Sequence, residues 1–169
     1  MPLPSQTPAP ASLDGFAAAL GRIPSGLFIV TWRVAHADRG MLASWVMQAG
    51  FEPPLVSVAV GTSRDLLGVI RAGGPFAVNV LAESQRSLLA RFGKPPAAGE
   101  DPFAGLVVDR TPAGVAVFAE AAAWMECRAV AEAAAAGADH VIVLGRIEAA
   151  GGQPDVAPLV HLRRNGLKY

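Results

Sequence analysis

The sequence predicts a mainly β protein whose strands form a closed or partly closed antiparallel barrel with a few short helices. Three observations favour this class. Six or seven short segments carry the β-branched and aromatic residues typical of strands. Most of these segments follow one another through short connections, which favours antiparallel pairing over βαβ units. The helical patterns number only three, and each of them is short.

The first part of the chain predicts one helix followed by three strands. Ser12 or Asp14 can cap a helix that ends near the turn at residues 24–26. The prolines at 53 and 54 cannot donate to a ladder, so they mark the beginning of a strand. The strands are expected at residues 27–33, 41–46 and 55–60, with a polar hairpin at 35–40.

The second part adds two helices and the remaining strands. Ser63 or Asp65 can cap a helix that stops at residues 73–75, and Ser84 opens another helix. Residues 129–136 are alanine-rich and favour a helix by propensity, but the alternation just before them favours a strand. Strands are expected at residues 76–81, 124–130, 141–147 and 159–162, and a surface loop at 93–105.

Length and composition indicate one domain with a large apolar surplus. The 169 residues fit a single domain at residues 13–169, preceded by a proline-rich flexible lead-in at 1–12. Hydrophobic residues make up 52% of the chain and charged residues 17%. No apolar run reaches the roughly 18–20 residues that a membrane helix needs. We therefore expect a buried interface between two copies, a homodimer, and no membrane association.

Charge and cysteine content narrow the partners and the compartment. Lysine plus arginine and aspartate plus glutamate number 14 each, so no electrostatic signal for nucleic acid is present. Cys127 is the single cysteine, which excludes an intrachain disulfide and favours a reducing compartment. The N-terminal residues show no basic segment followed by an apolar one. A cytoplasmic location is expected.

Several common sites are missing from the sequence. No glycine fingerprint of a dinucleotide-binding βαβ unit is present, and no phosphate-binding Walker loop. One cysteine and three scattered histidines do not form a zinc site of the usual spacing, so no metal is expected. The nucleophile-elbow motif of α/β-hydrolases is absent as well.

The segment at residues 40–64 predicts a mononucleotide site, with flavin as the leading candidate. Ala43, Ser44 and Gly61 are small enough for a flat aromatic ring to approach the backbone. Residues 62–64 offer two hydroxyls and a guanidinium that suit a phosphate. The alternatives are a helix cap at 62–64 and a core position for Trp45.

The order of short motifs along the chain resembles the flavin reductase-like family, and most closely the reductase module of cyanobacterial diflavin flavoproteins. The resemblance covers the chain from about Gly21 onward. The motifs are GRIPSGL at 21–27, MLASWV at 41–46, FEPP at 51–54, FAVNVLAE at 76–83, DPFAG at 101–105, ECR at 126–128 with Val130, and Asp-His at 139–140.

The resemblance implies a six-stranded Greek-key FMN-binding split barrel, a homodimer, and FMN near the dimer interface. FAD or free flavin are alternatives to FMN, and NAD(P)H is the implied reductant. In the family the flavin ring lies against the segment at 42–45, and the phosphate is held around 61–64. The expected cofactor-binding residues are Met41, Leu42, Ala43, Ser44, Trp45, Gln48, Val60, Gly61, Thr62, Ser63, Arg64 and Asp65.

Departures from the family pattern leave more than one function open. Leu42 replaces a common threonine, Trp45 a common serine, and Ala138 a common glycine, so no role is carried over to His140. His161 is the candidate catalytic residue facing flavin or nicotinamide, with a structural histidine as the alternative. The leading function is an NAD(P)H:flavin oxidoreductase. The alternatives are an FMN-binding electron-transfer module and a barrel that has lost flavin.

Overall fold

A computed structural model of the chain describes residues 12–97, 99–163, 166 and 167. The described residues divide into two compact units, and Gly26 to Val160 make up the larger one. The smaller unit consists of the described residues before Gly26 and after Val160. Apart from Ser12, the predicted lead-in at 1–12 lies outside the described residues.

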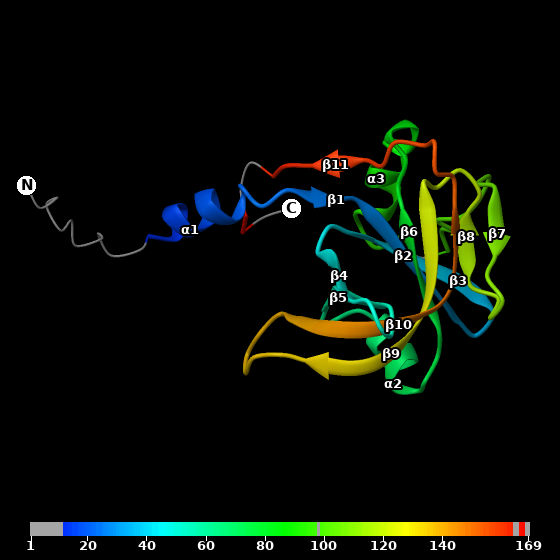
Figure 1. The fold of residues 1–169 in the computed structure, drawn as a ribbon, viewed down its shortest axis with the longest axis horizontal. Coiled ribbons are helices and arrows are strands. Elements are labelled where there is room, and N and C mark those ends of the chain that lie inside the picture. The colour runs from blue at the N-terminus through cyan, green and yellow to red at the C-terminus, as the bar shows by residue number, and fades with distance from the viewer. Residues whose placement is uncertain (1–11, 98, 164–165, 168–169) are drawn as a thin grey trace, which may run out of the picture. The chain divides into compact units, whose positions relative to one another are not determined.

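The larger unit is built on one seven-stranded antiparallel sheet, which confirms the mainly β, antiparallel prediction (Figure 1). Every neighbouring pair in this sheet runs antiparallel. In spatial order the strands are β3 (Ala37–Ala43), β2 (Phe28–Val34), β6 (Phe76–Val80), β9 (Ala123–Ala133), β10 (His140–Gly152), β5 (Leu55–Gly61) and β4 (Val46–Gly50).

Short elements complete the described structure. The larger unit also holds α2 (Leu66–Arg71), the 3-10 helix η1 (Glu83–Gln85), α3 (Leu88–Phe92), and the hairpin of β7 (Val108–Arg110) and β8 (Ala116–Phe118). The smaller unit holds α1 (Leu13–Leu20), which begins at its predicted cap, Ser12. β1 (Ser25–Gly26) and β11 (Val160–His161) form a two-stranded sheet. Within the residues described, no helix has the length and apolar character needed to cross a membrane.

The two edge strands of the large sheet, β3 and β4, are consecutive in the chain. Only Ser44 and Trp45 separate them, so the chain passes from one edge to the other in two residues. The Trp45 carbonyl accepts a hydrogen bond from Ala59 N at 3.0 Å, which anchors this link to β5. The prediction of one continuous strand at 41–46 is therefore wrong. We call residues 44–45 the edge link, and it lies at the split of the barrel.

A two-residue turn joins β2 to β3, where the sequence predicts a longer polar hairpin. Val34 pairs directly with Ala37, and Ala35 and His36 both have positive φ angles, 46° and 76°. This geometry matches the right-handed twist of the strands, but it usually selects Asn-Gly or a similar pair. The Ala-His pair carries no such signal, so four residues of β3 are assigned to a loop by the sequence alone.

The sheet separates two apolar clusters, because neighbouring residues of β2 point to opposite faces. Val30 and Trp32 belong to the cluster inside the barrel, together with Met41, Ala43 and Val60. Ile29 belongs to the cluster under α3, which also contains Phe92, Phe103 and Phe118. Both clusters are closely packed, and together they hold the strands that carry the candidate site.

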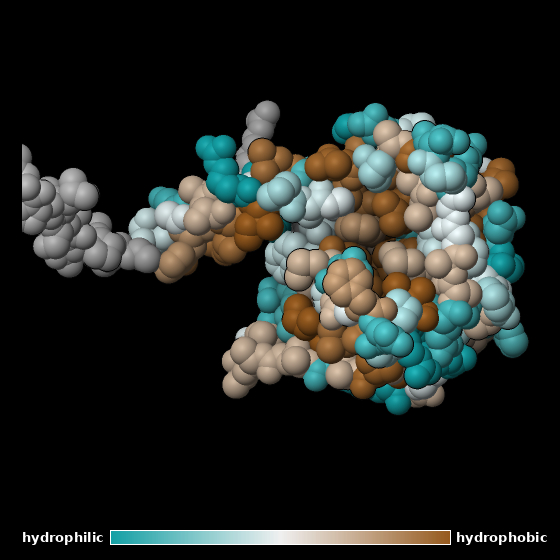
Figure 2. All heavy atoms as spheres, in the orientation of Figure 1, coloured by the Kyte–Doolittle hydropathy of each residue, from teal (hydrophilic) through white to brown (hydrophobic). Residues whose placement is uncertain are grey.

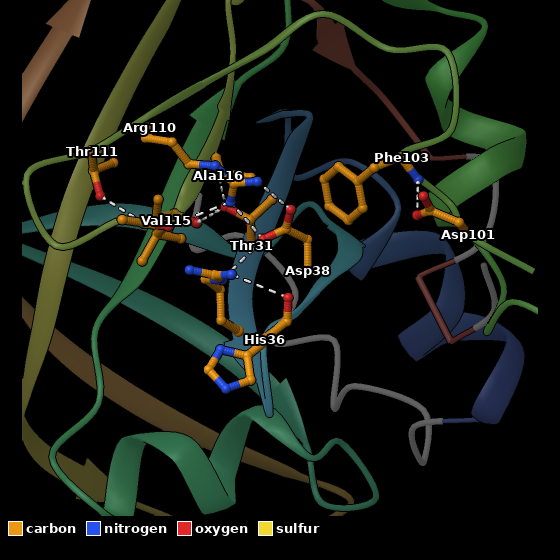
Figure 3. Close-up of polar contacts among 12 residues, drawn as sticks. Thr31, His36, Asp38, Asp101, Phe103, Arg110, Thr111, Val115 and Ala116 are labelled. Carbon is orange, nitrogen blue, oxygen red and sulfur yellow. Dashed lines mark hydrogen bonds and ion pairs between the residues drawn. The ribbon is translucent and has the colours of Figure 1, made fainter.

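A buried polar network ties the β7–β8 hairpin to the barrel. Thr31 Oγ1 donates to the Ala116 carbonyl at 2.6 Å, a contact that can be followed in Figure 3. Asn79 Oδ1 accepts from Phe118 N at 3.0 Å. The two strands of this hairpin have three residues each, which is too short for a pattern to predict them. Their position depends on these long-range bonds.

The first part of the alanine-rich segment, up to Ala133, forms a strand, as the alternation before it predicts. β9 continues to Ala133 and pairs with β10 up to Ile142. Gly137, with φ of 76°, lies in the turn between these strands. Pairing with β10 supplies the backbone hydrogen bonds that an isolated alanine-rich segment would make as a helix, so tertiary context overrides propensity.

Candidate functional site

Three segments that are distant in the sequence meet at the edge link. The ring centroids of Trp45 and His140 are 4.9 Å apart. His140 is the first residue of β10, and its register partner on β5 is Gly61. The next residue, Thr62, donates its backbone N–H to the Asp139 carbonyl at 2.9 Å. The structure therefore brings together predicted ring-contact and phosphate-contact residues, with a histidine between them.

Ser44 is the polar residue of the edge link. Its side chain is only 4% exposed, and its Oγ has no hydrogen-bond partner among the described residues. A buried hydroxyl without a partner costs free energy, which a ligand atom could recover. This unsatisfied atom lies within the segment for which the sequence predicts a flavin ring. The residues present therefore fit a polar aromatic ligand.

The other predicted ring-contact residues differ in what they offer. Met41 and Ala43 are buried in the barrel core, as is Val60 of the predicted phosphate segment, so these three offer a ligand only their backbone. Leu42 is half-buried against the cluster under α3. Gln48 is exposed on β4, and its amide donates to the Gly50 carbonyl at 3.4 Å. Of the side chains predicted for the ring, that of Trp45 contacts His140, which is the register partner of Gly61.

The predicted phosphate loop begins where β5 ends. Thr62 and Ser63 are exposed, and Arg64 is half-buried with no hydrogen bond or ion pair from its side chain to any described residue. Asp65 occupies the cap position of α2, but its side chain makes no capping bond. The structure thus confirms the predicted cap at Asp65 and excludes Ser63 from that position. The loop keeps its hydroxyls and its guanidinium available.

A cavity of about 370 Å³ opens beside this loop. Ser63, Arg64 and Asp65 form one wall, and Trp32 and Arg39 contribute from β2 and β3. Arg39 Nε lies 4.0 Å from Asp65 Oδ2, so the two arginines carry more charge than the single carboxylate can balance. The remaining lining residues are Gly40, Pro95, Pro96 and Pro102.

His140 is the site residue that sequence reasoning missed. Its Nδ1 lies 3.0 Å from the Asp139 carboxylate, a contact that becomes an ion pair when the imidazole is protonated. The hydrogen bond from His140, followed by its charge, lowers the pKa of Asp139 below the usual value. The Asp-His motif is visible in the sequence, but only the β5–β10 register shows that it reaches Gly61.

His161 belongs to the smaller unit, at the end of β11, where its side chain is half-buried. Its assignment as the catalytic residue therefore stays a prediction. Within the described residues, no group of three or more histidine, cysteine, aspartate or glutamate side chains could hold a metal ion.

A second cavity, of about 640 Å³, lies on the other side of Arg39. Its acidic side chains already have partners. Asp38 forms a two-pronged ion pair with Arg110, with N–O distances of 2.6 and 2.7 Å (Figure 3). The hydrogen bond to Asp38 raises the pKa of Arg110 above its usual value. Asp101 accepts from Phe103 N at 2.9 Å, and Glu100 from Ala97 N at 3.0 Å.

The larger unit exposes apolar side chains on and beside strands β4, β5 and β10, and we call this surface the apolar face. Figure 2 shows apolar side chains interspersed with hydrophilic ones over the region where Figure 1 labels these strands. Met47 is 71% exposed and Phe51 is 89% exposed. A shallow cavity of about 210 Å³ lies beside Met47, lined by Val46, Leu55 and Ile147 among others. Apolar residues that are exposed next to one another in a continuous patch mark an interaction surface.

Comparison with known proteins adds an independent line of evidence. The model of the flavin reductase like domain matches residues 20–166. Diflavin flavoprotein A 1 of Synechocystis sp. is 34% identical over 157 residues, which cover 89% of this chain and 26% of that protein. The chain thus spans about a quarter of the length of the curated relatives it matches.

Two solved structures have similar folds. The NADH:FAD oxidoreductase SgcE6 of Streptomyces globisporus superposes with a TM-score of 0.80 at 26% identity, covering 98% of this chain and 96% of that one. Nitrilotriacetate monooxygenase component B of Mycobacterium thermoresistibile gives 0.78 at 26%, covering 88% and 81%. The match of the domain model over nearly the whole chain, with the split-barrel fold, shows that the chain belongs to the flavin reductase-like family.

Proposed function

We propose that the protein is a flavin reductase-type oxidoreductase that binds FMN and transfers hydride from NAD(P)H to the flavin. The observation that carries the proposal is the buried Ser44 hydroxyl in the edge link, which has no hydrogen-bond partner among the residues that the structure describes. That link lies at the split of the barrel and is joined through Trp45 to His140 and Gly61. Family membership supports the same ligand class.

The edge link would hold the flavin ring. Ser44 Oγ offers one hydrogen bond to a polar atom of the ring, and the Trp45 indole offers an apolar surface. Gly61 has no side chain, so the ring can approach the backbone there. A Cβ at Gly61 would lie in ordinary contact with Arg64 and His140, at 3.8 and 3.9 Å.

The loop after β5 would hold the phosphate. Arg64 supplies a guanidinium that has no partner among the described residues, and Thr62 and Ser63 supply exposed hydroxyls. Charge-assisted hydrogen bonds of this kind are stronger than neutral ones, and a guanidinium can bind two phosphate oxygens at once.

The cofactor supplies the hydride chemistry when it is bound, so the protein needs no acid–base pair of its own. The tasks of the chain are to bind, to orient and to exclude water. We propose His161 as the catalytic residue, as the sequence predicts. The cytoplasmic location expected from the single cysteine also stays a prediction.

The similar proteins support a flavin and a nicotinamide nucleotide as the reactants, but they do not identify which flavin or which nucleotide. One structural neighbour is an NADH:FAD oxidoreductase by name, and it has also been solved with NAD and FAD fragments. We propose FMN for this chain, with FAD as the alternative, and a homodimer formed through the apolar face of β4, β5 and β10.

Leu42 favours a second candidate function, an electron-transfer module that binds flavin. Its half-buried aliphatic side chain packs on the cluster under α3 and offers the flavin ring no hydrogen bond. A barrel that binds flavin with one polar contact fewer could act as an electron-transfer module without significant NAD(P)H oxidation.

Anaerobic mixing of the FMN-loaded protein with NADH or NADPH separates the candidates. We expect the flavin absorbance band to bleach with at least one of the two nucleotides. FMN that binds but is reduced by neither nucleotide would favour the electron-transfer module. A protein whose melting temperature does not respond to FMN, and which stays colourless, would contradict both.

A further inference from the structure

The indole of Trp32 has an unused hydrogen-bond donor inside the barrel. Trp32 is 2% exposed, and its Nε1 has no partner among the described residues. Buried indole N–H groups usually find a partner, because leaving one unpaired costs the full desolvation penalty. Trp32 also lines the 370 Å³ cavity beside the predicted phosphate loop. The position therefore indicates an acceptor that the described part of the protein does not supply.

Donors dominate the lining of this cavity. Arg39 lies directly opposite Trp32 in the β2–β3 register, so both side chains emerge on the same face of the sheet. Arg64 adds a second guanidinium, and Ser63 adds a hydroxyl. Asp65 is the one carboxylate among the described lining residues, and its 4.0 Å separation from Arg39 is at the outer limit of an ion pair.

The neighbouring 640 Å³ cavity provides an internal comparison. Its three acidic side chains, Asp38, Glu100 and Asp101, are each held by a donor of the protein. In the smaller cavity, the indole N–H and the Arg64 guanidinium have no acceptor in the described residues. The smaller cavity is therefore built to receive an acceptor with several oxygen atoms and negative charge.

We propose that Trp32 and Arg39 complete a phosphate site, and that they determine the preference of the protein for phosphorylated flavin. Trp32 Nε1 donates one hydrogen bond to a phosphate oxygen, and Arg39 with Arg64 balances its charge. Asp65 opposes the anion and limits its affinity. The inference rests on the proposed function, because the phosphate is that of FMN bound at the edge link.

The test compares FMN with riboflavin, which has the same ring and lacks the phosphate. Trp32→Phe removes the N–H and keeps an aromatic ring, and Arg39→Gln removes one charge at a partly exposed position. We expect each variant to lose FMN affinity roughly ten- to a hundredfold, as for other hydrogen bonds to charged groups. Riboflavin affinity should stay unchanged. Affinities are measured by quenching of flavin fluorescence.

Two further variants serve as a control and as a test in the opposite direction. Arg71→Gln is the matched control, because Arg71 is also an exposed, ion-paired arginine but lies outside the cavity. It should leave both affinities unchanged. Asp65→Asn removes the opposing carboxylate and should increase FMN affinity without affecting riboflavin. If Trp32→Phe does not fold, judged by its melting temperature, Arg39→Gln and Asp65→Asn decide the question.

The contrary outcomes are distinct. Equal losses of FMN affinity and riboflavin affinity would show that Trp32 acts only through packing. An unchanged FMN affinity in the variants would show that the proposed phosphate site does not exist. An increased KM for NADPH, but not for NADH, at unchanged FMN affinity would assign the anion to the nucleotide and overturn the inference. If the unmodified protein binds neither flavin, the proposed function fails, and the inference fails with it.

Discussion

The indole of Trp45 meets the imidazole of His140 edge to face, with ring centroids 4.9 Å apart and ring planes inclined by 61°. One ring comes from the edge link and the other from the beginning of β10, almost a hundred residues later. Because His140 also pairs with Gly61, this contact joins the predicted ring segment to the predicted phosphate loop. The two rings therefore set the relative position of the two halves of the candidate site.

Replacing His140 with alanine should loosen Trp45 and weaken flavin binding. Aromatic pairs in this geometry contribute about 0.5–1.5 kcal/mol, which corresponds to a loss of about two- to tenfold in affinity. Titration of flavin fluorescence measures the change. His36→Asn is the control, because His36 lies in the β2–β3 turn with positive φ, a conformation that asparagine accepts. Equal affinity in both variants would mean that His140 does not position the site.

Gly61 tests whether the ring passes over the backbone of β5. Alanine at this position meets only ordinary contacts at 3.8 and 3.9 Å, so the fold should persist with an unchanged melting temperature. A bound ring would collide with the added methyl group, at a cost of about 1–3 kcal/mol in flavin affinity. Gly68→Ala is the control, since a Cβ there has nothing within 4 Å. Unchanged flavin affinity in Gly61→Ala would place the ring elsewhere.

Arg64→Ala should weaken FMN binding by about 1.5–3 kcal/mol, through loss of a charge-assisted phosphate contact. Within the described part of the chain its guanidinium has no partner to lose, so the stability of the apoprotein should change little. Calorimetric titration with FMN gives the difference, and riboflavin serves as the matched ligand. If the FMN affinity is unchanged in Arg64→Ala, the phosphate must be bound by Ser63 and by backbone N–H groups instead.

The sequence carried those parts of the fold that depend on a local pattern. β5 and β6 follow from apolar, β-branched runs, and the end of α2 follows from glycines, one of which has positive φ at Gly73. The turn at Ala35–His36 could not be predicted, because neither residue normally signals two positive φ angles. The β7–β8 hairpin could not either, since Asn79 and Thr31 hold it from distant strands.

The sequence alone indicates which residues make up the candidate site. It does not indicate how these residues are arranged in space. Small residues at 43–44 and hydroxyls at 62–63 indicate the ligand class from the sequence alone. That Met41 and Val60 point into the core follows only from the folded sheet, which fixes which face of each strand is inside. Trp32 and His140 join the site through cross-strand register, and register is a property of the sheet and not of the local sequence.

The apolar face provides a test of the homodimer. Phe51 is 89% exposed, and a side chain of that size is normally covered in an assembly. Phe51→Glu should shift the protein to a monomer, as measured by light scattering after gel filtration. Val107→Glu is the matched control, because Val107 is 73% exposed and lies outside this face. A dimer that persists in Phe51→Glu would exclude this face as the interface.

The buried thiol of Cys127 should be unreactive in the folded protein, and it should make the free energy of unfolding depend on pH. Burial, and then the nearby Glu126 and Glu148 carboxylates, raise the pKa of this thiol to about 12. In the unfolded chain the thiol ionises near its ordinary value of about 8.5. Between these two values the native state binds one more proton than the unfolded state, so the free energy of unfolding falls as pH rises.

Urea unfolding of the protein and of Cys127→Ala from pH 7.5 to about pH 10.5 isolates this contribution, since all other titrating groups are shared. The unmodified protein should lose more stability than the variant over this range, beginning near the pKa of the unfolded thiol. In the folded protein a chromogenic disulfide reagent should not modify Cys127 at pH 8, whereas unfolding should expose one reactive thiol. Rapid modification of the native protein, or parallel pH curves for the two proteins, would show that the thiol ionises within the fold and that burial does not control its chemistry.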